Sequence, residues 1–171
     1  FLENNKDAFL IGEDIEDTNK FTPKSYGGAF NVTRNLSTIF PKRVKNTPIS
    51  ESAIVGISAG YAIKNGRTIV EIMFGDFTTL IFDQVLQHIS KFEDMYNKAI
   101  KCPIIIRTPM GGKRGYGPTH SQSIEKFFIG IPNLLIIAFN HRINPEYIYN
   151  SLSETEKPAL LIENKTLYTI D

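Results

Sequence analysis

The sequence has a single cysteine, Cys102, and it has no tryptophan. One cysteine excludes an internal disulfide and a metal site built from several thiolates, and it fits a reducing compartment. The net charge is only +1, so the chain has no excess of basic residues of the kind that marks binding to nucleic acid or to an acidic membrane surface. Apolar runs such as residues 134–139 are far shorter than the roughly 20 residues of a membrane helix. The sequence therefore predicts neither a nucleic-acid partner nor a membrane partner.

The amino-terminal end also has no starting methionine, no basic stretch and no signal peptide. We therefore expect a domain of a longer polypeptide or a naturally short form. What is present is ordinary for a folded domain, since 42% of the 171 residues are hydrophobic and 22% are charged. That length suits one domain with a core of its own, and we assign residues 1–171 to it.

Short apolar runs alternate with longer segments of helical spacing. The first kind predicts strands and the second predicts helices. Alternation of this kind implies parallel strands joined by right-handed crossovers, hence an α/β fold with a mostly parallel central sheet between two helix layers. In such sheets ligands bind at the carboxyl ends of the strands, which points to the loops after Ile72 and Arg107. The expected strands are 8–12, 68–72, 103–107, 134–139 and 159–162, and the expected helices are 28–40, 51–64, 79–96, 121–130 and 145–152.

Three patterns suggest a catalytic or binding motif but lack its context. Residues 56–60 match the G-x-S-x-G elbow around Ser58, yet that elbow requires a preceding strand, and Ser58 falls inside the helix expected from residue 51. Residues 111–114 resemble a phosphate loop, but arginines stand where a glycine and a serine or threonine are required. The three histidines have no zinc-binding spacing.

Two residues stand out from the pattern. Glu51 opens an otherwise apolar helix after an extended segment, 47–49, that we expect to be buried. A carboxylate in the first turn commonly complements the helix dipole, and that explanation stays open. His120 follows a glycine-rich loop on the carboxyl side of a strand, a position where histidines are often functional.

Three stretches in order and spacing closely resemble the beta subunit of the thiamine-diphosphate-dependent 2-oxo acid dehydrogenases, the decarboxylating components of the pyruvate, branched-chain and acetoin-type complexes. They are residues 47–51, 70–77 and 107–123. Residues 12–14, 26–28 and 161–165 are similar to that family as well. The resemblance implies a transketolase-like pyrimidine-binding domain, and the family's carboxyl-terminal transketolase-type domain is absent from this chain.

The resemblance also implies roles for particular residues. Glu51 matches the glutamate that hydrogen-bonds the ring nitrogen of the cofactor's aminopyrimidine, and burial favours the protonated carboxyl that this requires. Phe77 matches the aromatic residue that stacks on the pyrimidine, and Met73 and Gln84 lie near it in the same pattern. His120 matches the active-site histidine that faces the substrate or the incoming lipoyl group.

The family's diphosphate-binding motif, Gly-Asp-Gly, is missing, since Gly75-Asp76 is followed by Phe77. The resemblance therefore implies that a partner chain holds magnesium and the diphosphate. That partner is an alpha subunit or a fused diphosphate-binding domain, and this chain is inactive alone. The family also implies pairing with a second copy, as in a heterotetramer, and contact with a lipoyl acyltransferase core.

Some beta subunits hold a potassium ion, which here corresponds to carbonyls near Ile104 and the loop after Leu152. Thr155 replaces an aspartate expected in that loop, so we assign no metal site there. We expect the protein in the bacterial cytoplasm or in an organelle matrix. Alternatives are another transketolase-like thiamine enzyme, a non-catalytic domain that retains the fold, and, least supported, a serine hydrolase.

Overall fold

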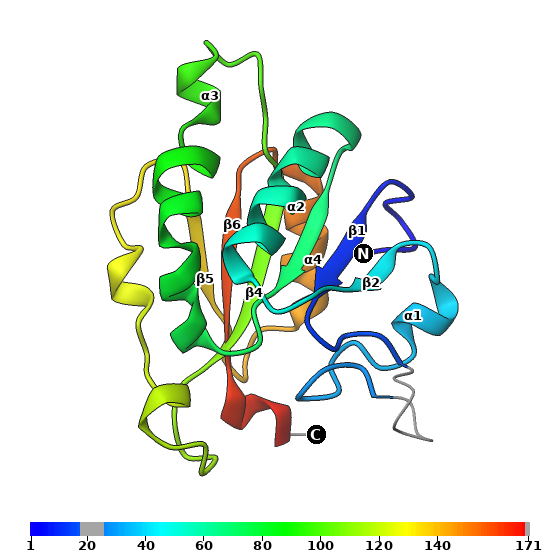
Figure 1. Ribbon diagram of the computed structural model, residues 1–171, viewed down its shortest axis with the longest axis vertical. Helices are drawn as coiled ribbons and strands as arrows, with labels where there is room; N and C mark the ends of the chain where they lie inside the picture. Colours follow the sequence, from blue (N-terminus) through cyan, green and yellow to red (C-terminus); the bar gives the residue numbers. More distant parts are fainter. Residues whose placement is uncertain (18–25, 170–171) are drawn as a thin grey trace.

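The computed structural model describes residues 1–17 and 26–169, and its centre is a six-stranded sheet (Figure 1). Every strand pair is parallel, as the alternating pattern predicts. A short strand at residues 44–46 was not expected, since three residues carry too little pattern to detect. In spatial order the strands are β2 (Val44–Asn46), β1 (Phe9–Gly12), β3 (Thr68–Glu71), β4 (Ile104–Met110), β6 (Ala159–Asn164) and β5 (Leu135–Ala138).

Helical segments cover both faces of the sheet (Figure 1). Helix α2 (Glu51–Asn65) and the segment from residue 75 to α3 (Phe92–Met95) cover one face, where they bury alternate strand residues such as Val70 and Ile106. On the other face, α4 (Pro145–Glu154), α1 (Leu36–Ile39) and the amino-terminal residues lie over Leu10, Ile69 and their neighbours. The expected three-layer α/β/α architecture is confirmed.

Three expected helices are wrong in extent. The segment 79–96 is a chain of short turns, 3₁₀ at Gly75–Ile81, π-helical at Gln84–Ile89 and α-helical only in α3. Residues 28–40 form only α1, because Gly28, Asn31 and Asn35 adopt positive φ and interrupt a helix. In 121–130 only the 3₁₀ turn Glu125–Phe127 forms, although Ile124 and Phe128 are buried as a helical spacing predicts. Apolar spacing thus reports which side chains are buried more reliably than it reports the backbone conformation.

Helix α2 has nearly the bounds that the sequence predicts. Its amino terminus lies at the edge of the sheet where the strands end. It stops at Gly66, whose φ of 117° closes the helix as the Asn-Gly pair predicts. Ser50 occupies the N-cap position, but its side chain makes no capping hydrogen bond. The preceding segment is not buried as expected, since Ile49 is 82% exposed.

No helix within the described residues is long and apolar enough to cross a membrane.

Candidate active site

Two carboxylates, Glu51 and Glu13, are buried together at this edge of the sheet. Glu51 is the first residue of α2 and is 8% exposed, while Glu13 follows directly after β1 and is 7% exposed. Burial raises the pKa of Glu13, and the nearby charges of Glu51 and then Asp14 raise it further. Oε1 of Glu13 is buried without a hydrogen-bond partner in the described part of the chain. Burial and the neighbouring charges thus favour the protonated form of Glu13.

Thr47 lies beside these carboxylates in the chain and in space. Its backbone N–H donates to the carbonyl of Gly12 at 3.0 Å, which fixes the segment before α2 against the end of β1. The Oγ1 of Thr47 is also buried without a partner among the described residues. Two polar atoms therefore lie unsatisfied near Glu51, and buried polar atoms of this kind are rare in native proteins unless they await a ligand or water.

A second group at this edge is aromatic and includes His120. The imidazole meets the ring of Phe74 edge-on, with 4.7 Å between ring centroids, and the ring of Phe77 at 5.2 Å. Phe77 belongs to the 3₁₀ turn that follows β3, and α2 packs against that turn. The structure therefore brings together Phe77 and His120, which the sequence assigned to one site, and it places them beside the helix that begins with Glu51.

Asp76 joins the Phe77 turn to the loop that carries His120. Its Oδ1 accepts hydrogen bonds from the side-chain amide of Gln122 at 2.7 Å and from that residue's backbone N–H at 3.3 Å. Gly75 is required just before it, because a Cβ there would lie 2.6 Å from Cγ of Met110. Asp76 is thus a structural tie between two segments of the site.

Met73 and Gln84, the two other expected cofactor contacts, flank this region. Met73 is half-buried at the end of β3, four residues before Phe77. Gln84 is half-buried opposite α2, where its Oε1 would be 3.4 Å from a Cβ placed on Gly56. Both positions are compatible with contact to a ligand that lies between α2 and the 75–81 turn.

Ser58 is unsuited to act as a nucleophile. It lies in the middle of α2, is almost completely buried, and its Oγ has no partner among the described residues. A nucleophile elbow requires an exposed serine on a sharp turn after a strand. The hydrolase alternative is therefore wrong.

A buried ionic cluster, which sequence reasoning missed, lies at the centre of the sheet. Arg107 donates from Nε to Glu163 at 3.0 Å, from Nη1 to Glu71 and from Nη2 to both Glu163 and Tyr168. Burial by itself raises the pKa of Glu163, but the charge and hydrogen bonds of Arg107 bring it below its usual value. Each of these charged residues ends or interrupts a run of apolar strand residues, and that was the available sequence signal.

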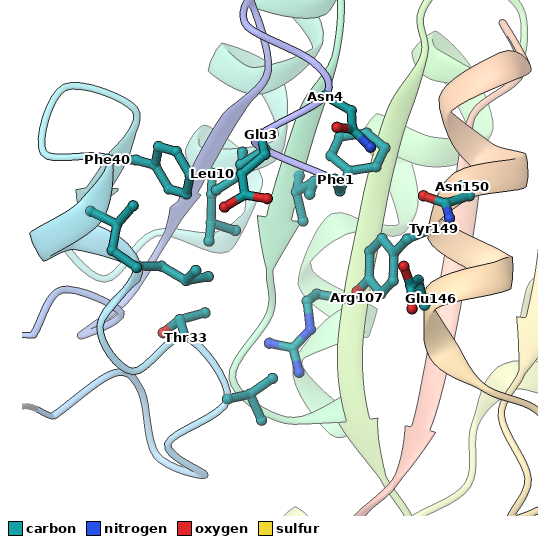
Figure 2. A pocket seen from close by; sticks show the side chains of 15 residues that line it. Phe1, Glu3, Asn4, Leu10, Thr33, Phe40, Arg107, Glu146, Tyr149 and Asn150 are labelled. Carbon is teal, nitrogen blue, oxygen red and sulfur yellow. The ribbon is translucent and has the colours of Figure 1, made fainter.

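A cavity of about 480 Å³ opens on the opposite face of the sheet from α2. Figure 2 shows it between α1 with its preceding loop and α4, with the Arg107 guanidinium and Tyr149 along its wall and Phe1 at its rim. None of the expected site residues lines this cavity. The candidate site is therefore the edge that carries Glu51 and His120.

In the loop after Leu152, for which the resemblance suggests a potassium site, two backbone carbonyls accept hydrogen bonds from a cationic side chain. Nη1 of Arg67 donates to the carbonyl of Leu152 at 2.9 Å and to that of Thr155 at 2.5 Å. Across residues 1–17 and 26–169 there is also no group of three or more histidine, cysteine, aspartate or glutamate side chains suited to a metal ion. These two carbonyls of the loop after Leu152 are therefore already hydrogen-bonded to a guanidinium.

Comparison with known proteins gives one consistent result. Residues 1–170 match the family model described as the pyrimidine binding domain of transketolase. The chain is 32% identical over 170 residues to the pyruvate dehydrogenase E1 component subunit beta of Gracilaria tenuistipitata var. liui, and 31% identical over 170 residues to the 2-oxoisovalerate dehydrogenase subunit beta of Bacillus subtilis (strain 168). Each alignment covers 99% of this chain and 50% of the relative, so the chain spans about half the length of these curated relatives.

A solved structure supports the fold. The chain resembles a split gene transketolase, described as an inactive beta4 tetramer, with a TM-score of 0.67 and 21% identity, over 94% of this chain and 45% of that one. Other relatives of the chain include a subunit from Oryza sativa subsp. japonica named as chloroplastic and one from Saccharomyces cerevisiae named as mitochondrial.

Proposed function

Because the chain belongs to the family of transketolase pyrimidine-binding domains, we propose that it binds the aminopyrimidine half of thiamine diphosphate in the decarboxylating component of a 2-oxo acid dehydrogenase. Its relatives are beta subunits of pyruvate and branched-chain 2-oxo acid dehydrogenases. The observation that carries the proposal is the buried Glu51, held at the start of α2 near Glu13, in the helix that packs against the turn bearing Phe77.

The residues at this edge fit an aminopyrimidine. Such a ring has a polar edge with an amino group and ring nitrogens, and it has two apolar faces. The unpartnered Oε1 of Glu13 and Oγ1 of Thr47 are hydrogen-bond acceptors for an amino group in this region. The half-buried ring of Phe77 suits stacking against a flat heterocycle, and Met73 and Gln84 supply further contacts.

Each side chain then has a defined task. The carboxyl of Glu51 hydrogen-bonds a ring nitrogen of the pyrimidine, and its position at the buried start of α2, near Glu13, keeps water away from that bond. When bound, thiamine diphosphate supplies the electron sink for decarboxylation. Nδ1 of His120 is hydrogen-bonded to the hydroxyl of Thr119 at 2.9 Å, so Nε2, with the imidazole supported by Phe74 and Phe77, acts as the hydrogen-bond donor toward the substrate or the lipoyl group.

The magnesium and the diphosphate of the cofactor need a binding site outside residues 1–171. We propose an alpha subunit or a fused diphosphate-binding domain that holds magnesium and the diphosphate, so that this chain is inactive alone. A second copy of this chain is a further partner, since α2 leaves Ile57 65% exposed and has open space at Gly60. A lipoyl acyltransferase core completes the complex, and the protein acts in the bacterial cytoplasm or in an organelle matrix.

The experiment is a Glu51→Gln variant of the full-length protein assembled with its partner. The amide keeps the shape of the side chain but cannot supply the acidic proton, so turnover of 2-oxo acids should fall to background while the melting temperature stays close to wild type. Glu154→Gln, at an exposed position in α4, is the matched control and should keep full activity. Near-normal turnover by Glu51→Gln contradicts the proposed function.

An affinity purification from the native lysate tests the partner. We expect a stoichiometric chain that carries Gly-Asp-Gly with a downstream asparagine. Recovery of the protein alone or only with copies of itself contradicts a separate alpha subunit and favours a fused diphosphate-binding domain or the non-catalytic alternative.

A further inference from the structure

Lys165 is a completely buried cation, with 0% of its surface exposed, directly after β6. A buried ammonium group normally pairs with a carboxylate, because desolvation of an isolated charge is costly. The other strongly buried cation, Arg107, follows this rule with Glu71 and Glu163. Among the ion pairs of the described residues, Lys165 has none. Its position therefore requires an explanation other than an ordinary salt bridge.

The ammonium of Lys165 instead reaches the loop that carries His120. Nζ of Lys165 donates a hydrogen bond to the backbone carbonyl of His120. It also lies 5.1 Å from the ring centroid of Phe74 and 5.3 Å from that of Tyr116, both within the range of a cation–π contact. Phe74 is the ring that meets the His120 imidazole edge-on at 4.7 Å. One side chain thus contacts both the backbone of His120 and the aromatic support of its imidazole.

The loop before His120 needs such an anchor. Gly111, Gly115 and Gly117 all adopt positive φ, and residues 113–119 are exposed. At its carboxyl end the loop is tied by the contacts of Gln122 with Asp76. The backbone N–H of His120 donates within the loop, to the carbonyl of Gly117 at 3.4 Å, and the bond from Lys165 joins the carbonyl of His120 to the end of β6, outside the loop.

Burial and neighbouring charges act on the pKa of Lys165 in opposite directions. Burial lowers the pKa of Lys165, the charge of Asp76 raises it, and the charge of Arg114 lowers it again. An apolar side chain of similar length would fill the same space without this desolvation cost. What the ammonium group adds over such a side chain is the hydrogen bond that it donates to the carbonyl of His120.

We propose that Lys165 is the positioning residue for His120, fixing its backbone and the Phe74 ring so that the imidazole faces the site in one orientation. The role of that orientation in catalysis rests on the proposed function above. The geometric part concerns only this chain and can be measured without cofactor or substrate.

The first test uses the full-length protein with Lys165→Met, which keeps an unbranched side chain one atom shorter and removes its donor. Trypsin cleaves after Lys113 and Arg114 in the exposed loop, so the cleavage rate reports how often the loop opens. We expect cleavage about tenfold faster, because the lost bond has a charged donor. Lys42→Met, at an exposed lysine far along the chain, should cleave in this loop at the wild-type rate.

The second test follows the imidazole directly by NMR. The chain has only three histidines, and His88 and His141 are exposed and serve as internal references. Ring currents from Phe74 and Phe77 shift the His120 C–H resonances away from those of His141. In Lys165→Met we expect this difference to shrink, and in Lys165→Arg, which retains a donor and a charge, we expect most of it to return.

The third test is kinetic and uses the assembled enzyme. Lys165→Met should raise the KM for the acyl acceptor or lower kcat for acyl transfer, while thiamine diphosphate binding stays at the wild-type level. A variant with wild-type cleavage, unchanged His120 resonances and only a lower melting temperature overturns the proposal in favour of a purely structural role. If Lys165→Met does not fold, Lys165→Gln removes the charge and shortens the donor, and unchanged loop cleavage with unchanged His120 resonances in that variant overturns the proposal equally.

Failure of this proposal is distinct from failure of the proposed function. If Glu51→Gln keeps its activity, the function is wrong, yet the cleavage and NMR results on Lys165 still decide whether it positions His120.

Discussion

Arg107 and Glu163 form a two-point ion pair in the middle of the sheet, with Nε of the arginine 3.0 Å from Oε1 of the glutamate and Nη2 bonded to Oε2. Glu71 is bound by the remaining nitrogen, Nη1. One cation therefore serves two buried carboxylates. Burial raises the pKa of Glu71, and Arg107 offsets this only in part.

Replacing Arg107 with Met leaves Glu71 and Glu163 buried without a cation. We expect a loss of about 3–5 kcal/mol in the free energy of unfolding, as is typical when one partner of a buried pair is removed. Urea denaturation of the full-length protein measures it. Arg142→Met, at an exposed arginine, is the control and should change stability little. A loss below about 1 kcal/mol for Arg107→Met, the scale of an exposed pair, would show that the cluster is solvated rather than buried.

The hydrogen bonds of Arg67 lead us to expect that potassium does not change the melting temperature of this protein. Its guanidinium already donates to the carbonyls of Leu152 and Thr155, so the wild type should melt at the same temperature in KCl and NaCl at equal ionic strength. Arg67→Met should lower the melting temperature, since each carbonyl left unsatisfied costs roughly 1–3 kcal/mol when buried. A higher melting temperature of the wild type in KCl would contradict this assignment and restore the ion site.

The raised pKa of Glu13 predicts that the stability of the folded protein depends on pH. Its pKa is raised in the folded protein by burial and by the charge of Glu51, so the folded state binds this proton more tightly than the unfolded state. The stability from this group is fully present below the ordinary value of 4.5 and is lost as the pH rises through the higher folded value. Glu13→Gln should therefore melt at a higher temperature than wild type at neutral pH, with the difference disappearing in acid.

Asp14→Asn is the control for Glu13, because Asp14 is adjacent in the chain but exposed. Its melting curve should differ little from wild type across the pH range. An equal gain at neutral and acidic pH for Glu13→Gln would mean that packing, not ionisation, causes the change.

Much of the fold follows from local sequence. The β-branched runs at β3 and β4 and the Asn-Gly stop of α2 are strong signals, because strand propensity and helix termination depend on residues close in the chain. The expected grouping of Phe77 and His120 came from a resemblance in motif and spacing, and the structure places these two rings in contact.

Other features depended on tertiary structure. The segment 79–96 has helical spacing but folds as successive 3₁₀, π and α turns, since burial of its apolar side chains does not require one regular helix. The burial of Glu13 and Lys165 also left no local pattern, because neighbours from distant segments determine it.

The sequence by itself determined the parallel α/β class, the helix that begins with Glu51 and the family of the chain. Only the tertiary structure decided that Glu13 faces Glu51, that Arg67 lies on the loop carbonyls and that Lys165 reaches His120. These are two hydrogen-bonded pairings and one charge–charge interaction between residues from about 40 to 90 positions apart, and a local pattern of propensity and periodicity carries no information on such pairs.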